Sequence, residues 1–228
     1  MDVFGLALTD FYRDNATADT LWLHNSYDDV EEMPVDIFFR SEEEMPPLEL
    51  QAIDLCYGKV LDVGAGVGSH ALVLQKAGID VTAIDISANA VQIMKQRGVK
   101  KALEQSIFLT DEKYDTLLFL MNGIGLTGTM SGFVNFLTQA KNLILPNGQL
   151  LFDSSDISYL YEELPKPEQT YFGEISYCYE YKAQKGNWFN WLYLDQETLK
   201  HTANQNGWKC EIIFDDGEDQ YLARLTIS

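Results

Sequence analysis

The stretch KVLDVGAGVGSHALVLQKAGIDVTAIDIS, residues 59–87, decides the fold of this chain. It begins with a short apolar run over residues 60–63, rich in β-branched side chains and typical of a buried parallel strand. A loop with glycine at alternate positions follows, at Gly64, Gly66 and Gly68. Glycines in such a loop allow backbone conformations that a Cβ forbids and let the chain approach a ligand closely.

A helix and a second strand complete this unit. Ala71 and Leu74 lie at helical spacing, and Gly78 is a typical helix stop. A second apolar strand over residues 81–84 then ends on Asp85. Strand, glycine loop, helix, strand and terminal acid together predict a nucleotide-binding βαβ unit, in which the acid accepts hydrogen bonds from ribose hydroxyls.

The spacing of the loop indicates which nucleotide is bound. The dinucleotide pattern G-x-G-x-x-G/A requires glycine or alanine where this chain has Ser69. The pattern from Asp62 to Gly68 is D-x-G-x-G-x-G, and it resembles motif I of the class I S-adenosylmethionine-dependent methyltransferases. An acid at Asp62 suits a cofactor with a methionine ammonium, whereas it would repel a pyrophosphate. An NAD-dependent dehydrogenase and a glycine loop without a cofactor are the alternatives.

The resemblance implies that S-adenosylmethionine is the cofactor and that the glycine loop and the end of the second strand bind it. The implied cofactor residues are Asp62, Gly64, Ala65, Gly66, Gly68, Asp85 and Ile86. The implied fold is α/β: a Rossmann-like, doubly wound, seven-stranded, mostly parallel sheet whose last strand is antiparallel. We expect residues 1–58 to form a helical N-terminal lid, residues 59–228 the methyltransferase core, and residues 157–193 a substrate-side insertion with an aromatic β-hairpin.

Two further strand ends are expected to contact the cofactor. The third strand falls within residues 99–109, and members of the family often place an adenine-binding acid just after it. The matching residues here, Ser106 and Ile107, include no acid, so the Ser106 hydroxyl or the backbone is the expected partner. The fourth strand, residues 116–121, ends on Met121 and Asn122, where the transferred methyl group is expected because ligands bind at the carboxyl ends of parallel strands. Asn122 is equally explained as a turn residue.

The N-terminal segment carries four side chains with site potential: His24, Tyr27, Phe39 and Arg40. We expect Arg40 to hold the carboxylate of the cofactor's methionine, because a guanidinium can form two parallel hydrogen bonds to a carboxylate. Each of the four is also explained without function, as a surface histidine, a core aromatic or a solvated arginine.

No catalytic dyad is evident. Asp153 ends the fifth strand, residues 149–153, and Asp156 follows it; with His24 they are the candidate proton acceptors. Asp156 is better explained as the cap of a short helix that residues 158–161 suggest. In-line methyl transfer needs positioning more than a base.

Aromatic residues concentrate in the predicted insertion. Tyr177, Tyr179 and Tyr181 alternate as in a strand, and the turn of the hairpin is predicted at residues 185–187. Its aromatics are expected to wall a substrate pocket, to form a homodimer interface, or to pack across the strands.

The amino-acid composition excludes several classes of function. The 228 residues carry 35 acidic and 16 basic side chains, a net charge of −19, which disfavours binding to nucleic acid. Three scattered cysteines give no metal-ligand spacing and suggest a cytoplasmic protein without metal. No run is long and apolar enough to span a membrane. A small-molecule methyltransferase is therefore the leading hypothesis. A protein or RNA methyltransferase and a non-catalytic S-adenosylmethionine-binding protein are the alternatives.

Overall fold

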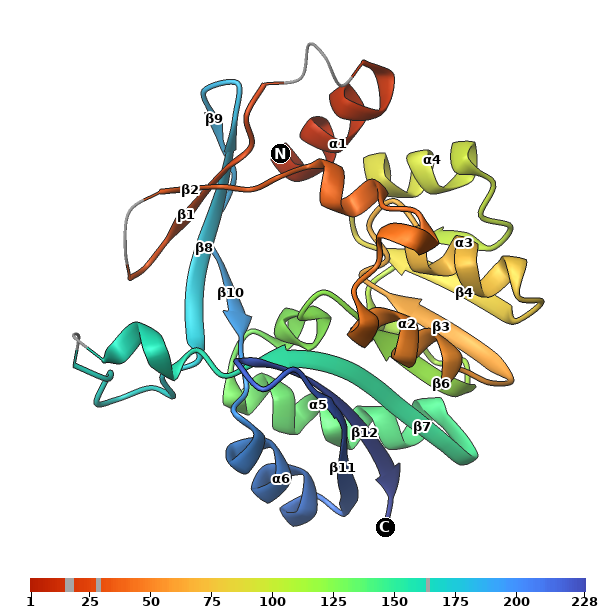
Figure 1. Cartoon of the computed structure of the whole chain (residues 1–228), viewed down its shortest axis with the longest axis vertical. Coiled ribbons are helices and arrows are strands. Elements are labelled where there is room, and N and C mark those ends of the chain that lie inside the picture. The colour runs from red at the N-terminus through yellow and green to blue at the C-terminus, as the bar shows by residue number, and fades with distance from the viewer. Residues whose placement is uncertain (15–18, 28–29, 163–164) are drawn as a thin grey trace.

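The computed structural model describes residues 1–14, 19–27, 30–162 and 165–228. A seven-stranded sheet forms its centre (Figure 1). Its strands are, in spatial order, β11 (Trp208–Asp215), β12 (Gln220–Ile227), β7 (Ile144–Ser155), β6 (Tyr114–Phe119), β3 (Lys59–Val63), β4 (Asp80–Asp85) and β5 (Ala102–Glu104). The pairs from β7 to β5 are parallel, and β12 is antiparallel to both of its neighbours. The mostly parallel sheet with an antiparallel last strand was correctly predicted.

Helices cover both faces of this sheet, as buried parallel strands require. One face carries α2 (Pro47–Asp54), α3 (Ser69–Lys76) and α4 (Ala88–Arg97), and the other carries α5 (Met130–Leu143) and α6 (Gln196–Gln205). Each face buries one large apolar cluster against the strands. Ser87 and Asp195 cap α4 and α6, since their side chains accept hydrogen bonds from the backbone of these helices.

A second sheet stands beside the carboxyl edge of the first (Figure 1). It consists of β10 (Phe189–Leu192), β8 (Glu174–Tyr181), β1 (Trp22–Asn25) and β2 (Glu31–Glu32), and β9 (Gln184–Lys185) pairs with β8. The N-terminal segment and the insertion are thus joined, because β1 is antiparallel to β8. The N-terminal segment combines this short pair of strands with the helix α1 (Val3–Arg13), which packs on β8 and α4.

The hairpin is present, but its turn is not where we predicted it. Glu180 pairs with Lys185 and Tyr181 with Gln184, so Lys182 and Ala183 form a two-residue turn. Both of these residues have positive φ, at 50° and 59°, as a type I′ turn requires. The prediction of a turn at residues 185–187 was wrong because glycine and asparagine are better local turn signals than lysine and alanine.

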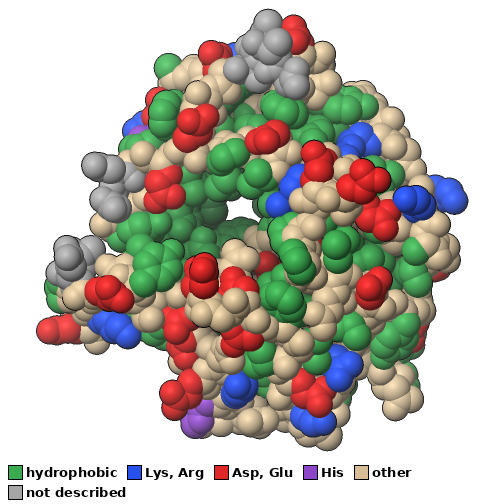
Figure 2. Space-filling model, in the orientation of Figure 1, with side chains coloured by type: hydrophobic (Ala, Val, Ile, Leu, Met, Phe, Trp, Pro, Cys, Tyr) green, Lys and Arg blue, Asp and Glu red, His purple; other side chains and the backbone are tan. Residues whose placement is uncertain are grey.

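The molecule is hollowed between its two sheets. Figure 2 shows an opening there, bordered mainly by hydrophobic side chains. Because the four central strands β3, β4, β6 and β7 are parallel, the loops that follow them all lie at the edge of the sheet that faces this hollow. Among the helices in the described ranges, none has the length and apolarity needed to cross a lipid bilayer.

Candidate functional site

The glycine loop between β3 and α3 has the backbone that its sequence predicts. Gly64, Gly66 and Gly68 all have positive φ, at 67°, 54° and 81°. The loop is tied to the sheet by a hydrogen bond from the Ala65 N–H to the Ile84 carbonyl. A Cβ added to Gly66 would meet no atom of the protein within 4 Å. The space beside Gly66 is therefore open to a ligand.

Asp85, at the end of the neighbouring strand β4, is hydrogen-bonded to the glycine loop. Its carboxylate accepts a hydrogen bond of 2.9 Å from the Gly66 N–H and one of 2.8 Å from the Ser87 N–H. Burial raises the pKa of Asp85 to about 6, against the lowering effect of these two bonds. Ile86, the next residue, is 78% exposed. An acid held at the loop and an exposed apolar side chain beside it together suit a ribose and an adenine ring.

Asp62 lies in β3, immediately before the loop, and is almost completely buried. Its Oδ2 atom has no hydrogen-bond partner in the described part of the chain. Burial raises the pKa of Asp62 to about 6, and the charge of Asp85 adds to this effect, while that of His70 opposes it. An orphaned buried carboxylate oxygen is costly, and an ammonium donor from a ligand would satisfy it. The site therefore fits the methionine end of S-adenosylmethionine.

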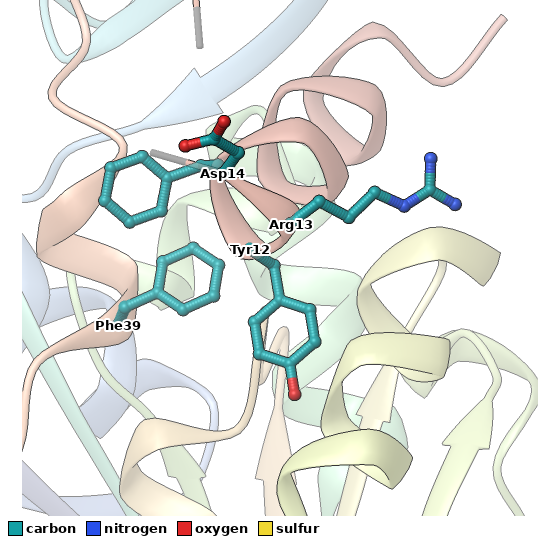
Figure 3. Close-up of a pocket in the computed structure, with 5 residues that line it drawn as sticks. Tyr12, Arg13, Asp14 and Phe39 are labelled. Carbon is teal, nitrogen blue, oxygen red and sulfur yellow. The ribbon is translucent and has the colours of Figure 1, made fainter. Parts of the chain in front are cut away.

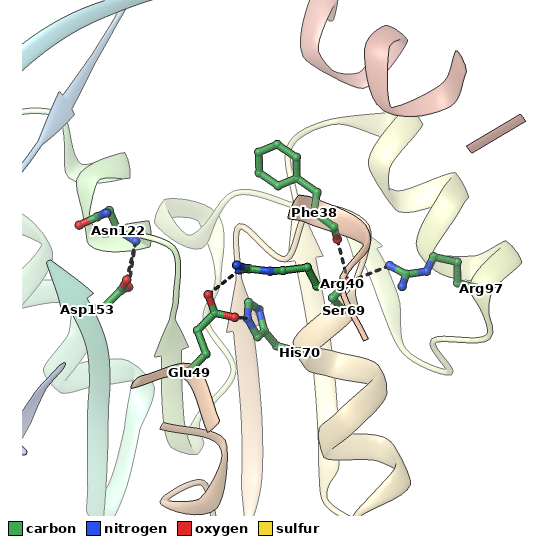
Figure 4. Close-up of polar contacts among 8 residues, drawn as sticks. All are labelled: Phe38, Arg40, Glu49, Ser69, His70, Arg97, Asn122 and Asp153. Atoms are coloured by element: carbon green, nitrogen blue, oxygen red, sulfur yellow. Dashed lines mark hydrogen bonds and ion pairs between the residues drawn. The ribbon is translucent and has the colours of Figure 1, made fainter. Parts of the chain in front are cut away.

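The tip of β6 holds two residues in strained conformations. Met121 and Asn122 have φ of 61° and 55°, which is unusual for residues with a Cβ and frequent at functional sites. The Asn122 N–H donates to both carboxylate oxygens of Asp153 at 2.9 Å (Figure 4). The Ser155 hydroxyl donates to the Asn122 amide oxygen at 3.1 Å. Asn122 forms a turn at the edge of the sheet that faces the hollow. Its role as a turn residue is therefore compatible with a position beside the transferred methyl group.

Asp153 is buried beneath this tip. Burial raises its pKa to about 7, against the Asn122 N–H, which lowers it. Asp156 instead accepts a hydrogen bond of 2.9 Å from the Ser158 N–H, at the start of the short 3-10 helix η5 (Ser158–Tyr161). The N-cap of η5 is Ile157, which forms no side-chain cap bond, so Asp156 forms a local turn with the backbone two residues on and is not the predicted cap.

Arg40 belongs to a buried charge network that the sequence analysis missed. Glu49 in α2 accepts a hydrogen bond of 2.6 Å from the Arg40 guanidinium, and its other oxygen lies 2.8 Å from His70 Nε2 (Figure 4). The Glu49 side chain is 6% exposed. A guanidinium has five N–H donors, so Arg40 retains donors for a cofactor carboxylate. The available signal was a glutamate on the same helical face as Ala52 and Ile53.

A second set of bonds holds the N-terminal segment against the glycine loop and the start of α3. Ser69 donates to the Phe38 carbonyl at 2.7 Å, and Arg97 donates to the Val67 carbonyl at 2.8 Å and to Ser69 at 3.1 Å (Figure 4). The Arg97 guanidinium also lies 5.4 Å from the ring centre of Phe39. Phe38 and Phe39 belong to the 3-10 helix η1 (Asp36–Phe39), so this part of the N-terminal segment lies closed over the loop.

Phe39 lines a pocket within the N-terminal segment. The pocket has a volume of about 340 Å³ and lies between the end of α1 and η1 (Figure 3). Phe11, Tyr12, Arg13, Asp14 and Phe39 line it. None of these residues belongs to the strand ends where we expect the cofactor, so we assign the pocket no part in cofactor binding.

Ser106 and Ile107 lie beyond β5. The Ser106 hydroxyl accepts a hydrogen bond from the Phe108 N–H, and Ile107 is buried in the core. Ile107 can therefore offer a ligand only its backbone. Gln105, next to Ser106, is tied to β4 by a hydrogen bond of 2.9 Å from its N–H to the Asp85 carbonyl.

His24 is placed away from the loop. It lies opposite Cys178 in the second sheet, and its ring bonds Glu180 at 2.8 Å. Side chains alternate across a strand, so His24 and Glu180 share one face of the sheet while Leu23 and Tyr179 share the other. The latter face packs against α1, which places His24 on the side remote from the core.

One group of carboxylates lies outside these predictions. Asp216, Glu218 and Asp219, in the turn between β11 and β12, have ligand atoms within 4.8 Å of one another. Exposed acids of this kind commonly gather without an ion, and we assign no metal to them.

Both a family model and solved structures match this chain. The chain matches the model of the family described as "Methyltransferase domain" over residues 44–211. The crystal structure of an S-adenosylmethionine-dependent methyltransferase from Bacteroides fragilis, in complex with S-adenosyl-L-homocysteine, is 42% identical, with a TM-score of 0.91. That match covers 100% of this chain and 95% of the other. This chain belongs to the class I S-adenosylmethionine-dependent methyltransferases, and the family resemblance read from the sequence is confirmed.

More distant structures share the fold. The structure titled "DhpI-SAM-HEP complex" is 19% identical, with a TM-score of 0.62, over 79% of this chain and 84% of the other. The CcbJ methyltransferase from Streptomyces caelestis is 13% identical, also with a TM-score of 0.62, over 83% of this chain and 99% of the other. The comparison with curated proteins found no match.

The raised pKa values predict how cofactor binding depends on pH. The carboxyls of Asp62 and Asp85 have an ordinary pKa of 3.8 and are raised to about 6 in the folded protein. Their ionised forms are the ones that pair with an ammonium or accept from ribose hydroxyls. Binding therefore favours loss of their protons, and affinity should fall as pH is lowered through 6, by up to about tenfold per pH unit for each group.

Calorimetric titration of S-adenosylhomocysteine at pH 6, in two buffers of different ionisation enthalpy, measures this proton release directly. We expect the protein to release protons on binding and the dissociation constant to increase between pH 7 and pH 5. An affinity independent of pH across that range would contradict the placement of both carboxylates at the ligand.

Proposed function

We propose that this enzyme transfers a methyl group in line from S-adenosylmethionine to a small molecule bound between the two sheets. The observation that carries the proposal is the open glycine loop, spanned by Asp85 and adjoining the orphaned Asp62 carboxylate. In this arrangement Asp85 accepts from the ribose hydroxyls and Asp62 pairs with the ammonium. Arg40 binds the methionine carboxylate with donors that Glu49 does not use.

The remaining predicted contacts complete the cofactor site. Ile86 lies against the adenine, whose amino group is met by the Ser106 hydroxyl or by the backbone at Ile107. Met121 and Asn122, at the tip of β6, stand beside the transferred methyl group. We further propose residues 1–58 as the lid, residues 59–228 as the core and residues 157–193 as the substrate-side insertion. The hydrogen bonds that Ser69 and Arg97 donate to the carbonyls of η1, beside the loop, support the lid.

Bound S-adenosylmethionine supplies an already activated methyl group on a positively charged sulfur. The main task of the chain is therefore to orient the acceptor on the side of the methyl opposite the sulfur and to exclude water. Orientation of this kind is worth an effective molarity of roughly 10⁵–10⁸ M. The lid contacts made by Ser69 and Arg97 serve the exclusion of water, because they close η1 over the loop.

A small-molecule acceptor is supported by the charge and the shape of the site. A net charge of −19 opposes binding of a nucleic-acid backbone, and the hollow is bordered mainly by hydrophobic side chains. A protein or RNA methyltransferase, and a binding protein without turnover, are the alternatives. A cytoplasmic location and a homodimer stay predictions.

The test of cofactor binding is a pair of isosteric substitutions at the two ends of β4. Asp85→Asn removes the charge at the loop, and Asp80→Asn does so at the far end, where Asp80 forms an exposed ion pair with Lys101. We expect Asp85→Asn to weaken the binding of S-adenosylmethionine about 10–100-fold, since a charge-assisted hydrogen bond is worth about 1.5–3 kcal/mol. We expect the second to leave the affinity unchanged. Equal calorimetric dissociation constants for the two variants would remove Asp85 from the site.

A further inference from the structure

Glu49 is shared by two basic side chains. Its Oε1 atom accepts a hydrogen bond of 2.6 Å from the Arg40 guanidinium, and its Oε2 atom lies 2.8 Å from His70 Nε2 (Figure 4). A carboxylate only accepts, so His70 donates to it from Nε2. The His70 and Glu49 side chains are 8% and 6% exposed. Within the described ranges, neither Arg40 nor His70 forms an ion pair with any other acid.

The surroundings of His70 favour its charged form. Burial lowers the pKa of His70, but the hydrogen bond to Glu49 and the charges of Asp62 and Asp153 raise it more, so the net direction is upward. These carboxyls come from three elements, α2, β3 and β7, and Arg40 faces the same glutamate from the N-terminal segment. Protonated His70 and Arg40 thus carry two positive charges against the single negative charge of Glu49.

This network lies beside the glycine loop. α3 begins with Ser69 and His70, directly after the last glycine of the loop. The Ser69 hydroxyl donates to the Phe38 carbonyl at 2.7 Å, which holds the end of η1, and with it Arg40, next to the loop. Asp62 precedes the loop at its other end, and its orphaned Oδ2 atom is buried. An unpartnered carboxylate thus stands at one end of the loop and two cations that share one glutamate stand at the other.

The two ends of the loop carry opposite net charge. Arg40, His70 and Glu49 together have one positive charge in excess, and Asp62 has one negative charge. A ligand group with one carboxylate and one ammonium matches both ends, and the amino-acid end of S-adenosylmethionine is such a group. With a neutral His70, the first end would have no net charge to attract a carboxylate. Asp153 lies outside this count, since its carboxylate accepts a backbone N–H at the tip of β6.

We propose, resting on the proposed function, that His70 is a positioning residue for the cofactor, since its positive charge occupies Glu49 and leaves the Arg40 guanidinium free to bind the methionine carboxylate. His70 acts through Glu49 and needs no contact with the ligand. A neutral side chain at position 70 would leave Glu49 to Arg40 alone, and the guanidinium would be neutralised before a ligand arrives. Recognition of the carboxylate is thereby separate from recognition of the ribose and the ammonium, which depend on Asp85 and Asp62.

Two ligands that differ only in the carboxylate test this inference: S-adenosylhomocysteine and its decarboxylated form, which keeps the adenosine, the thioether and the ammonium. Each is titrated calorimetrically into the unaltered protein. We expect S-adenosylhomocysteine to bind at least about tenfold more tightly, as one charge-assisted hydrogen bond provides. Equal affinity for the two ligands would overturn the proposal. Failure of S-adenosylhomocysteine to bind at all would instead refute the proposed function.

His70→Gln tests the part played by the histidine charge. We expect this variant to bind S-adenosylhomocysteine about tenfold more weakly, the effect of losing one nearby opposite charge, and the decarboxylated form no more weakly than before. His24→Gln is the matched control, because His24 also bonds a glutamate, Glu180, at 2.8 Å, but in the second sheet. It should keep the full preference for S-adenosylhomocysteine. Unchanged affinities in His70→Gln, or an equal loss for both ligands, would refute the assignment.

NMR titration of the imidazole signals follows the charge of His70 in the unaltered protein, and it therefore stands even if His70→Gln does not fold. The chain has three histidines, and the spectra of His24→Gln and His201→Gln assign the other two. Coupling between sites is reciprocal, so a carboxylate that binds better to charged His70 must raise its pKa. S-adenosylhomocysteine should raise the pKa of His70, and the decarboxylated form should not. The same pKa of His70 with either ligand bound would overturn the proposal.

Discussion

Gly66→Val should abolish binding of S-adenosylmethionine while leaving the protein folded. Gly66 has a φ of 54°, and the space beside its α-carbon is open. A valine there would extend into the volume in which the cofactor approaches the backbone, so we expect the dissociation constant to increase by at least ~100-fold. Its left-handed backbone should also cost about 1–2 kcal/mol of the free energy of unfolding.

The chain offers a matched control for this substitution. Gly78, at the turn between α3 and β4, also has a positive φ, at 85°, and also has no atom within 4 Å of an added Cβ. Gly78→Val should therefore lose a similar free energy of unfolding and keep its affinity for the cofactor. If the two variants bind S-adenosylmethionine equally well in calorimetry, the loop is not the cofactor site.

Glu49→Ala should cause the largest loss of stability. Glu49 is buried and holds both Arg40 and His70. Burial lowers the pKa of His70, but Glu49 and the charges of Asp62 and Asp153 raise it more, so the net direction is upward. Removing one partner of a buried ion pair leaves uncompensated charge and costs about 3–5 kcal/mol. At about 2–4 °C per kcal/mol for a chain of this size, Tm should fall by roughly 6–20 °C.

Glu42→Ala is the comparison for this loss. Glu42 also joins the N-terminal segment to α3, through Lys76 at 2.8 Å, but the two side chains are 45% and 78% exposed. Exposed ion pairs are worth about 0–1 kcal/mol, so this variant should unfold near the Tm of the unaltered protein. Thermal unfolding of the two variants, measured side by side, gives the contribution of the buried Glu49 network to stability. A Tm for Glu49→Ala within a degree of that for Glu42→Ala would mean that the buried network contributes nothing.

Local signals explain why the core could be predicted from the sequence. The strand, glycine loop and helix are consecutive, and Asp85 follows the second strand directly, so their roles depend on spacing alone. The helix stripe of Phe133, Phe136 and Leu137 is likewise local, and these residues are fully buried.

The hairpin of the second sheet was predicted, but its pairing with the N-terminal strands could not be, because these strands are far apart in the chain. Trp22 pairs with Glu180 and Asn25 with Tyr177, across about 150 residues, and nothing local marks such a pairing. The tight turn at Lys182 and Ala183 was missed for a related reason, since residues that are poor turn formers adopt positive φ when the paired strands impose it. The Arg40, Glu49 and His70 network depends on the same long-range packing.

The central claim is that the glycine loop and Asp85 hold S-adenosylmethionine. A crystal structure of the protein soaked with S-adenosylhomocysteine tests it most directly. We predict the ribose hydroxyls within hydrogen-bond distance of the Asp85 carboxylate and the ligand ammonium beside Asp62. Ligand bound elsewhere, with the space beside Gly66 still empty, would contradict the account.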